Sequence, residues 1–367
     1  MNSFEKYGLI TNPFRVTPAT NPSELIWAGF KDTKQKIEKR ISRSISTPPS
    51  TLVLNWGEYG SGKTHAARYF NKEDVLIDLA DAKKKPLSFY ISFPKSKEPV
   101  KDIYTQIIDK LNIGEIRQLA NDNDLHIEDT ILNNITDNIF IRNIVKLIFN
   151  NQASEKVLKT YLYGNYKISD SLINAGVSRK LSTDNDYIEL LGALFSFITY
   201  QKQACSSVII WIDEFEDISL QTSTNISNVN NFIRSLLDFT PNNLLIFLNL
   251  TQTATMNRED LGEYLLSALK TRIRAHIELG TPDDMALKEY MQELMNNPVH
   301  RIKDCGKSEY EPFTTELIDS IIRNEKGASL RRYNEIFSLL LEYAISDGKD
   351  VIDTQYFESI KDEIICC

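Results

Sequence analysis

One stretch of this sequence constrains the fold more than any other. Residues 57–64 read Gly-Glu-Tyr-Gly-Ser-Gly-Lys-Thr, the pattern Gly-x-x-x-x-Gly-Lys-[Ser/Thr]. An apolar run from Thr51 to Trp56 precedes the motif, and a helix-like segment from His65 to Phe70 follows it. A phosphate-binding loop joins a strand to a helix in this way, whereas a glycine-rich turn that binds nothing explains neither flank. The sequence therefore predicts a P-loop, and with it a parallel α/β sheet.

The residue types of this loop match the chemistry of phosphate binding. Glycines let the backbone curl so that successive N–H groups point at phosphate oxygens, and a helix that starts near Gly62 adds its positive end. Lys63 is predicted to bridge the β- and γ-phosphates, and the Thr64 hydroxyl is predicted to hold Mg²⁺. The residues predicted to contact the nucleotide here are Gly57, Tyr59, Gly60, Ser61, Gly62, Lys63, Thr64 and His65.

Composition narrows the class of protein. The chain has 367 residues, 42% of them apolar, and a formal net charge of −8. This charge argues against a chain built wholly around nucleic-acid phosphates, although a local basic patch remains open. No apolar run approaches the length of a membrane span, and the N-terminus lacks a signal-peptide core. The four cysteines form no C-x-x-C pair, so we expect reduced thiols and a cytoplasmic protein.

Apolar runs and helical patterns alternate along the chain. Further strands are predicted at residues 86–93, 207–212, 244–250 and 274–279, with helices at 31–43 and 229–238. Residues 97–200 read as a large, mostly helical insert, and residues 281–367 read as helices only. We therefore expect an N-terminal linker (1–50) that contacts the nucleotide, an α/β core with a parallel five-stranded sheet (51–280) and a helical lid domain (281–367).

Two carboxylates end the third predicted strand. Asp213, at the tip of a buried strand in a P-loop protein, is predicted to hold Mg²⁺ through its water shell. Glu214 is predicted to act as the general base on the attacking water. An acidic turn is the alternative, because Glu216 and Asp217 follow at once.

The fourth predicted strand ends in polar residues. Asn249 and Thr251 are both candidates for the group that holds the attacking water near the γ-phosphate. The sequence does not separate the two, and simple turn chemistry is the alternative for either of them.

The order of these features resembles the AAA+ ATPases: a P-loop, an Asp-Glu strand, a polar-tipped strand, an arginine-bearing helix and a helical lid. Tyr7-Gly8-Leu9 and Asn12-Pro13-Phe14 resemble the N-terminal signature of the ExeA-type and transposition-helper ATPases, which are relatives of the origin-recognition ATPases. The resemblance implies ATP as the nucleotide and implies that Pro13 and Phe14 lie against the adenine. A turn before a short buried aromatic is the alternative for Asn-Pro-Phe.

The resemblance also suggests roles for arginines. In such families an arginine before the last strand reaches the γ-phosphate of a neighbouring subunit, so Arg272 is the candidate arginine finger and Arg274 is second. A solvated basic helix end is the alternative. Gly327 to Asn334 resembles the Gly-x-x-Arg lid motif with one residue inserted. We favour Arg331 over Arg332 as the lid arginine that contacts the nucleotide.

The insert departs from a compact AAA+ module. Residues 158–164, 172–177 and 184–197 are similar in order to the ORC-like ATPases of bacterial phage-exclusion (BREX) systems. Ala175 to Arg179 also resembles the turn of a helix-turn-helix, with Ser178 as a possible cap of a second helix. An ordinary interhelical turn is the favoured alternative, because few basic or amide side chains follow.

The sequence supports two main hypotheses of function. The first is an oligomeric AAA+ ATPase with shared nucleotide sites, which acts as a motor or switch on DNA or on DNA-bound partners, in a mobile-element or phage-defence system. The second is a STAND-type signalling ATPase that gates assembly with an effector protein without binding DNA. A nucleotide-binding module without hydrolysis is a third hypothesis, which the intact Lys63, Thr64, Asp213 and Glu214 disfavour.

Overall fold

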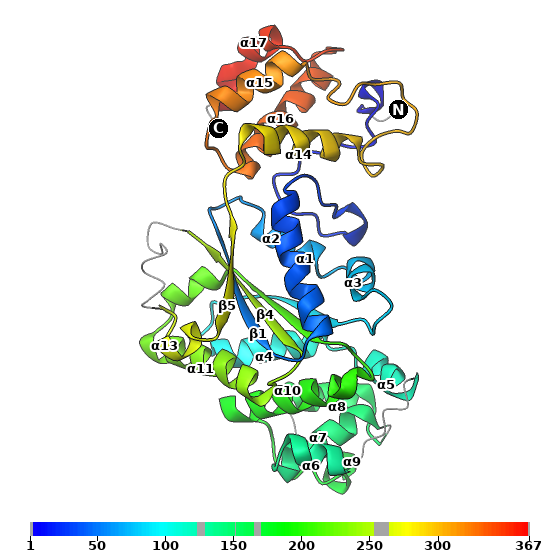
Figure 1. Ribbon diagram of the computed structural model, residues 1–367, viewed down its shortest axis with the longest axis vertical. Helices are drawn as coiled ribbons and strands as arrows, with labels where there is room; N and C mark the ends of the chain where they lie inside the picture. The colour runs from blue at the N-terminus through cyan, green and yellow to red at the C-terminus, as the bar shows by residue number, and fades with distance from the viewer. Residues whose placement is uncertain (1–2, 123–128, 151, 165–169, 253–263, 366–367) are drawn as a thin grey trace. The chain divides into compact units, whose positions relative to one another are not determined.

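The computed structural model describes residues 3–122, 129–150, 152–164, 170–252 and 264–365 (Figure 1). The chain forms two compact units. Unit 1 consists of Met1–Gln35, Gly57–Phe70 and Glu278–Cys367, and unit 2 consists of Lys36–Trp56 and Asn71–Ile277. These units do not follow the predicted boundaries, because the N-terminal segment and the P-loop group with the C-terminal helices.

Unit 2 contains the sheet, apart from the last residues of β1 and β5. Its five strands are all parallel and lie in the order β2-β3-β4-β1-β5. This arrangement confirms the predicted α/β fold class. The strands are β1 (Thr51–Gly57), β2 (Leu87–Ser92), β3 (Val208–Asp213), β4 (Leu244–Thr251) and β5 (Ile273–Leu279).

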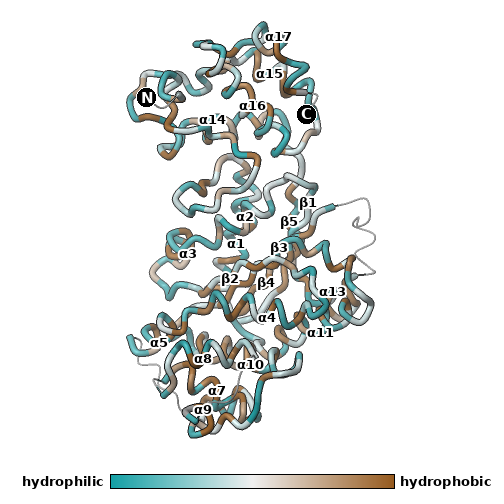
Figure 2. Tube along the Cα trace, turned by 180° about the vertical axis from the view of Figure 1, so that it is seen from behind, coloured by the Kyte–Doolittle hydropathy of each residue, from teal (hydrophilic) through white to brown (hydrophobic). Residues whose placement is uncertain are grey.

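Burial explains why the strands could be recognised. Every residue of β3 and β4 is buried, which fits central parallel strands covered on both faces. The hydropathy-coloured tube shows this hydrophobic content in the strands (Figure 2). Trp211 and Phe247 are register partners and stack with their ring centroids 3.8 Å apart. In β5, at the edge of the sheet, buried and exposed residues alternate.

Helices cover the two faces of the sheet (Figure 1). Leu52, Leu54 and Ile210 point to one face and share a core with α4 (Pro99–Lys110), α10 (Asp184–Ile198) and α11 (Ser223–Phe239). Residues 36–46 of α1 (Lys31–Ser46) cross the other face and bury Ile37, Ile41 and Ile45. The shorter elements are α3 (Glu73–Ala80), η3 (Tyr200–Lys202), η4 (Phe215–Leu220) and α13 (Ser267–Lys270).

The insert is helical, as the sequence predicts. Between α4 and α10 lie α5 (Ile113–Asp122), α6 (Asp129–Ile135), α7 (Ile139–Phe149), α8 (Glu155–Leu162) and α9 (Asp170–Asn174). The suggested helix-turn-helix is wrong, because no helix begins at Ser178. Residues 177–182 are non-helical, and Thr183 caps α10 instead. Arg179 donates two hydrogen bonds to the buried carboxylate of Asp186, so its side chain is committed to the fold.

Unit 1 has a core of its own. It contains α2 (Lys63–Tyr69), α14 (Asp284–Asn296), α15 (Thr315–Asn324), α16 (Leu330–Ser346), α17 (Thr354–Ile365) and the short helices η1 (Glu5–Tyr7) and η2 (Pro22–Glu24). Tyr7, Leu9 and Phe14 pack among the hydrophobic residues of α14–α17. The N-terminal segment is therefore part of a helical core.

Candidate functional site

The P-loop has the backbone conformation that its glycines predict. Gly60 and Gly62 have φ of +80° and +95°, in the left-handed region that favours glycine. A Cβ atom on Gly57 would lie 2.4 Å from the carbonyl oxygen of Leu279, so this position also has no room for a side chain. The loop leads into α2, which begins at Lys63 with Gly62 as its N-cap.

The Lys63 ammonium lies inside this loop. The residue is 7% exposed, and Nζ donates to the carbonyl oxygens of Gly57 (2.9 Å) and Glu58 (2.7 Å) and to Oγ of Ser61 (3.3 Å). An ammonium at this position can donate a charge-assisted hydrogen bond to an anion. Thr64 follows in the first turn of α2.

A lid arginine packs on the P-loop within unit 1. The Arg331 guanidinium donates to the Tyr59 hydroxyl and lies 5.0 Å from the Tyr59 ring centroid. Its backbone N–H donates to the Gly60 carbonyl oxygen (3.2 Å). Arg332 instead pairs with Glu335 (2.9 Å) and Glu325. The structure thus places Arg331, the favoured residue, at the loop.

A chain of four hydrogen-bonded polar side chains crosses the carboxyl end of the sheet in unit 2. Asp213 accepts a hydrogen bond from the Tyr90 hydroxyl on Oδ2 (2.8 Å) and from Asn249 Nδ2 on Oδ1 (2.9 Å). Asn55 Nδ2 in turn donates to Asn249 Oδ1 (2.9 Å). The strands β2, β3, β4 and β1 contribute one link each, in their spatial order. We call these four residues the polar ladder.

The polar ladder contains two residues that the sequence prediction missed. Asn55 is 1% exposed in an otherwise apolar strand, and this break in the pattern was a usable signal. Tyr90 carried no such signal, because tyrosine is a common strand residue. Of the two candidates at the tip of β4, Asn249 contacts Asp213, whereas the Thr251 backbone N–H donates to Glu216 Oε2 (3.0 Å).

The carboxylate oxygens of Asp213 suit Mg²⁺ as ligands. Each carboxylate oxygen accepts one neutral hydrogen bond and keeps further lone pairs, and hard oxygen ligands suit this ion. In the described part of the chain, no group of three His, Cys, Asp or Glu residues could hold a metal by itself. Mg²⁺ in nucleotide sites needs only one or two protein ligands, because phosphates and water complete its shell.

Glu214 has the geometry of a functional residue. It is exposed and has φ of +56°, an uncommon conformation for a residue with a side chain. Partial burial and then the neighbouring Asp213 carboxylate raise the pKa of its carboxyl above the usual value. A raised pKa suits a general base, because the carboxylate then accepts a proton more readily.

The candidate arginine finger is paired within unit 2. Arg272 forms a bidentate ion pair with Asp238, at 2.7 and 2.9 Å, and Nη1 donates to the Ala268 carbonyl oxygen (2.8 Å). Arg274, the second candidate, is exposed on the edge strand β5. Asp238 therefore holds the Arg272 guanidinium in a defined orientation, and this ion pair would have to break before Arg272 could reach a phosphate.

Pro13, Phe14 and His65 contact protein rather than an open pocket. Phe14 is 2% exposed, and its ring lies 5.3 Å from Phe337 and 5.8 Å from Phe313. Its backbone N–H donates to the Asn12 side chain (3.0 Å), and Pro13 is buried between them. This is the alternative interpretation of Asn-Pro-Phe, a turn before a buried aromatic. The expected stacking on adenine finds no support in this packing.

His65 is held in unit 1 by the N-terminal segment. Its Nε2 lies 2.8 Å from the Ile26 carbonyl oxygen, so this nitrogen carries the proton. Burial lowers the pKa of the imidazole. The neutral ring therefore fixes the segment to α2 and leaves Nε2 no capacity for a phosphate.

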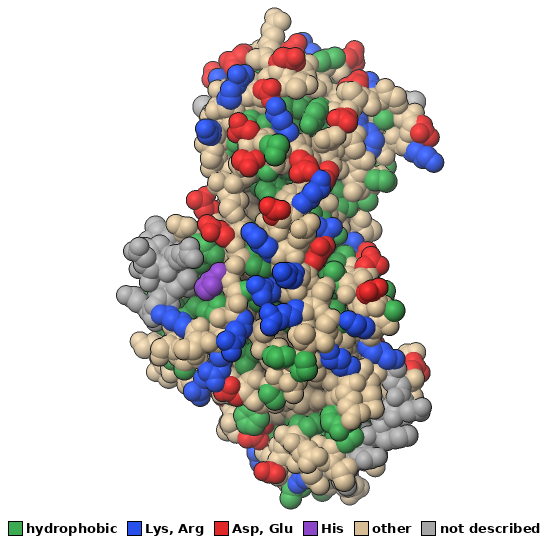
Figure 3. Space-filling model, in the orientation of Figure 1, with side chains coloured by type: hydrophobic (Ala, Val, Ile, Leu, Met, Phe, Trp, Pro, Cys, Tyr) green, Lys and Arg blue, Asp and Glu red, His purple; other side chains and the backbone are tan. Residues whose placement is uncertain are grey.

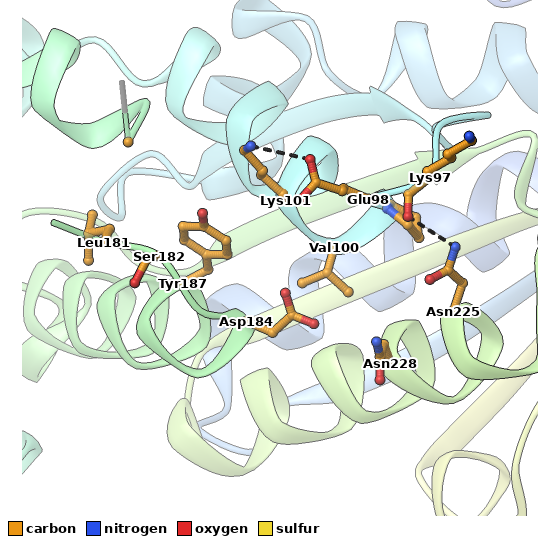
Figure 4. A pocket seen from close by; sticks show the side chains of 12 residues that line it. Lys97, Glu98, Val100, Lys101, Leu181, Ser182, Asp184, Tyr187, Asn225 and Asn228 are labelled. Carbon is orange, nitrogen blue, oxygen red and sulfur yellow. Dashed lines mark hydrogen bonds and ion pairs between the residues drawn. The ribbon is translucent and has the colours of Figure 1, made fainter. Parts of the chain in front are cut away.

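A separate polar pocket of about 340 Å³ lies in unit 2, between the insert and the starts of α4 and α11. Asp184 and Lys101 are among its lining residues, and the Glu98 carboxylate pairs with Lys101 in its wall (Figure 4). None of the predicted site residues lines this pocket.

Comparisons with known proteins agree with the α/β architecture. No family model matches the sequence, and no curated protein matches it. Among solved structures, Aeropyrum pernix ORC2 in its ADP form superposes with a TM-score of 0.57 at 11% identity, covering 97% of this chain and 73% of that one. Aeropyrum pernix ORC1 in complex with DNA gives 0.53 at 11% identity, with 97% and 70% covered.

Pyrobaculum aerophilum Cdc6p gives a TM-score of 0.52 at 10% identity, covering 97% of this chain and 72% of that one. At these identities the likeness shows the fold alone. The chain thus has an AAA+ fold of the ORC/Cdc6 type. Within the described ranges, no helix has the length and apolar content needed to span a bilayer.

Proposed function

We propose that this chain binds ATP with Mg²⁺ and hydrolyses it. The observation that carries the proposal is the P-loop, in which Lys63 is buried among backbone carbonyls of a glycine-shaped loop at a helix N-terminus. The AAA+ fold supports the same assignment. A phosphate in the loop would accept a charge-assisted hydrogen bond from this ammonium, which is stronger than a bond to a neutral acceptor.

The two groups of site residues have complementary chemistry. Lys63, Thr64 and the loop N–H groups bind the phosphates, and Arg331 contacts the nucleotide from the lid. Asp213 and Thr64 would hold Mg²⁺, which neutralises charge on the β- and γ-phosphates when bound. Action of the two groups on one nucleotide is proposed from the sequence pattern, in which the P-loop follows one strand and Asp213 ends another.

Glu214 is the proposed base for the attacking water. Its carboxylate accepts a proton as the water attacks the γ-phosphorus, while Asn249 fixes the carboxylate of Asp213 beside it. Arg272 is proposed to act on the nucleotide of a neighbouring subunit, after it leaves Asp238. The chain would then work as a homo-oligomer with shared sites.

We also propose that the assembly acts as a motor or switch on DNA or on DNA-bound partner proteins. The ORC1 relative was solved in complex with DNA, which supports this choice over the signalling alternative. Service in a mobile-element or phage-defence system rests on the sequence resemblance alone. A STAND-type switch differs in that a protein trigger, and not DNA, stimulates its turnover.

The test is the ATPase rate per subunit, measured against protein concentration with and without duplex DNA. A rate that rises with concentration and with DNA supports a shared site and action on DNA, whereas a flat line removes Arg272 from the mechanism. Glu214→Gln should retain ATP and lose about 10²–10⁴-fold in turnover.

The pH dependence tests the base further. The base must be ionised, and its pKa is raised above 4.5, so turnover should fall on acidification at a pH above that value. Glu216→Gln, which changes a nearby carboxylate, should keep this acidic limb. Full turnover in Glu214→Gln would rule out the assigned base.

A further inference from the structure

The chain is acidic overall, yet one face of unit 2 is basic. Lysine and arginine side chains gather on the face that carries α1 and β5 (Figure 3). We call this the α1 basic surface. It consists of Lys36, Lys39, Arg40 and Arg43 of α1, Lys83 of the segment after α3, and Arg274 of β5.

The fold turns these side chains outward. Ile37, Ile41 and Ile45 are at most 1% exposed, so they fix which side of α1 faces the sheet. In β5, Ile273 packs with the core on the opposite face, so Arg274 points to the face that α1 covers. Lys83 Nζ donates to Ser46 Oγ (2.8 Å), which joins this lysine to the end of α1.

The positive charge of this surface is uncompensated. No described carboxylate forms an ion pair with any of its six cations, and Glu38 is the sole acidic residue among residues 36–46. The half-buried Lys202, which donates to the Ile45 carbonyl oxygen, has its pKa lowered by burial and by Lys83. The helix dipole accounts for a cation in the last turn, such as Arg43, but not for those in the earlier turns.

The spacing and composition favour nucleic acid over protein. Lys36, the Lys39–Arg40 pair and Arg43 recur about once per helical turn over about 10 Å. One strand of a duplex presents a phosphate about every 3.4 Å along its axis, so about three phosphates face this row. Protein interfaces centre on apolar or aromatic anchors, and among the described residues no exposed large hydrophobic side chain lies in 36–46 or 273–277.

We propose that the α1 basic surface binds the phosphate backbone of double-stranded nucleic acid. The inference deepens the proposed action on DNA and rests on it. It assigns DNA binding to a helix before the P-loop and to the sheet edge. Contacts of this kind position a protein on a duplex without reading its sequence.

The experiment compares two full-length triple variants with matched charge changes. The surface variant is Lys36→Gln, Lys39→Gln and Arg43→Gln. The control variant is Lys110→Gln, Lys156→Gln and Lys180→Gln, which removes three exposed lysines elsewhere in unit 2. Binding of a labelled duplex of about 30 base pairs is followed by fluorescence anisotropy at several salt concentrations, without nucleotide.

The surface variant should bind at least about tenfold more weakly near 0.1 M salt, and its log–log salt slope should be shallower by about 2.7, whereas the control should match the wild type. Equal affinity and slope in both variants would overturn the proposal. Polyglutamate that competes as well as the duplex would also overturn it, in favour of an acidic protein partner.

Basal ATPase without DNA separates this inference from the proposed hydrolysis. The surface variant should keep that rate, because its substitutions lie outside the site residues. If the wild type hydrolyses no ATP but the surface variant still loses duplex binding, the surface stands and the hydrolysis falls. If the wild type hydrolyses ATP but binds no duplex, the hydrolysis stands and the surface proposal falls.

Discussion

At the scale of single residues, Asp213 owes its orientation to neutral donors from two neighbouring strands. A carboxylate with one hydrogen bond on each oxygen cannot rotate without breaking both. Lone pairs are then presented in a fixed direction, which a hydrated cation needs. The proposed Mg²⁺ site would therefore depend on Tyr90 and Asn249 as well as on Asp213.

Tyr90→Phe is expected to weaken Mg²⁺ binding without unfolding the protein. A hydrogen bond to a charged group is worth about 1.5–3 kcal/mol, so the Mg²⁺ concentration for half-maximal ATPase should rise about tenfold. The measurement is ATPase rate against Mg²⁺ at saturating ATP.

Tyr163→Phe is the control for this variant, because it also removes a tyrosine hydroxyl bound to a carboxylate, that of Asp109. It should leave the Mg²⁺ dependence unchanged. An equal response of the two variants would show that Tyr90 has only a packing role.

Arg272 and Asp238 form a second residue-scale test. If Arg272 leaves Asp238 to act in trans, Arg272→Ala should lower turnover by about 10³-fold or more, whereas Asp238→Asn should preserve or raise it. Both rates are measured at a concentration where the wild type is fully active. A parallel loss of turnover and of thermal stability in both variants would mean that the ion pair only supports the fold.

Sequence reasoning at this scale succeeded where chemistry needs rare residue patterns. Gly60, Gly62 and Lys63 form the predicted loop, because few other conformations suit that motif. The burial of Phe14 could not be predicted from the sequence, since it depends on partners more than 290 residues away, such as Phe313. A sequence shows that a residue is apolar, but not which surface covers it.

At the scale of elements, β3 and β4 could be predicted because every residue in them is buried, which leaves a continuous apolar run. The start of α10 was less clear. Ser178 was considered as a helix cap, yet Thr183 forms a reciprocal capping box with Asp186 three residues on. The decisive signal was therefore the spacing of Thr183 and Asp186 and not the glycine turn before it.

Asp186→Asn is expected to destabilise the protein by about 2 kcal/mol at neutral pH. Burial raises the carboxyl pKa, but hydrogen bonds from Arg179, Ser182 and Thr183 outweigh it and lower the pKa to about 2. A depressed pKa stabilises the fold above the unfolded value of 3.8, and this contribution is lost as pH falls from 3.8 towards about 2.

The measurement is urea unfolding of wild type and variant at a series of pH values, where the difference should shrink on acidification. Asp184→Asn is the neighbouring control. Burial and then Glu98 raise the pKa of Asp184, so the ionised group is disfavoured in the fold and Asp184→Asn should stabilise the protein at neutral pH. This gain, opposite in sign to the loss in Asp186→Asn, should vanish on acidification. A constant difference for Asp186→Asn across this range would contradict the assigned charge interaction.

At the scale of the whole molecule, the division into two units was not readable from the chain. The predicted boundaries followed the sequence in order, whereas unit 1 collects the N-terminal segment, the P-loop with α2 and the C-terminal helices. Contacts such as Asn12 to Ser338 and Arg331 to Gly60 join segments that are hundreds of residues apart. Composition and periodicity do not predict which distant residues contact each other.

Phe14→Ala tests whether this N-terminal aromatic serves unit 1 or the nucleotide. A large-to-small change in a core costs about 3–5 kcal/mol, so amide exchange in α14–α17 should accelerate markedly. The ratio of KM values for ATP and GTP should stay unchanged, because no contact with the base is lost.

Phe239→Ala removes a ring that is 40% exposed and serves as the control, with little effect on either quantity. A selective rise in the KM for ATP, without faster exchange, would restore the adenine-stacking role of Phe14.

The polar ladder has a consequence for how the sheet assembles. Its members occupy one strand each, and successive side chains of a strand point to opposite faces. If β1, β2, β3 or β4 slipped by one residue, its member would turn to the opposite face, which packs against α4, α10 and α11. Its ladder partners would then lose their hydrogen bonds, at about 1–3 kcal/mol for each buried group. The same hydrogen bonds that orient Asp213 would thus also disfavour wrong strand pairings, so a sheet in the wrong register would lose both the proposed site and part of its stability.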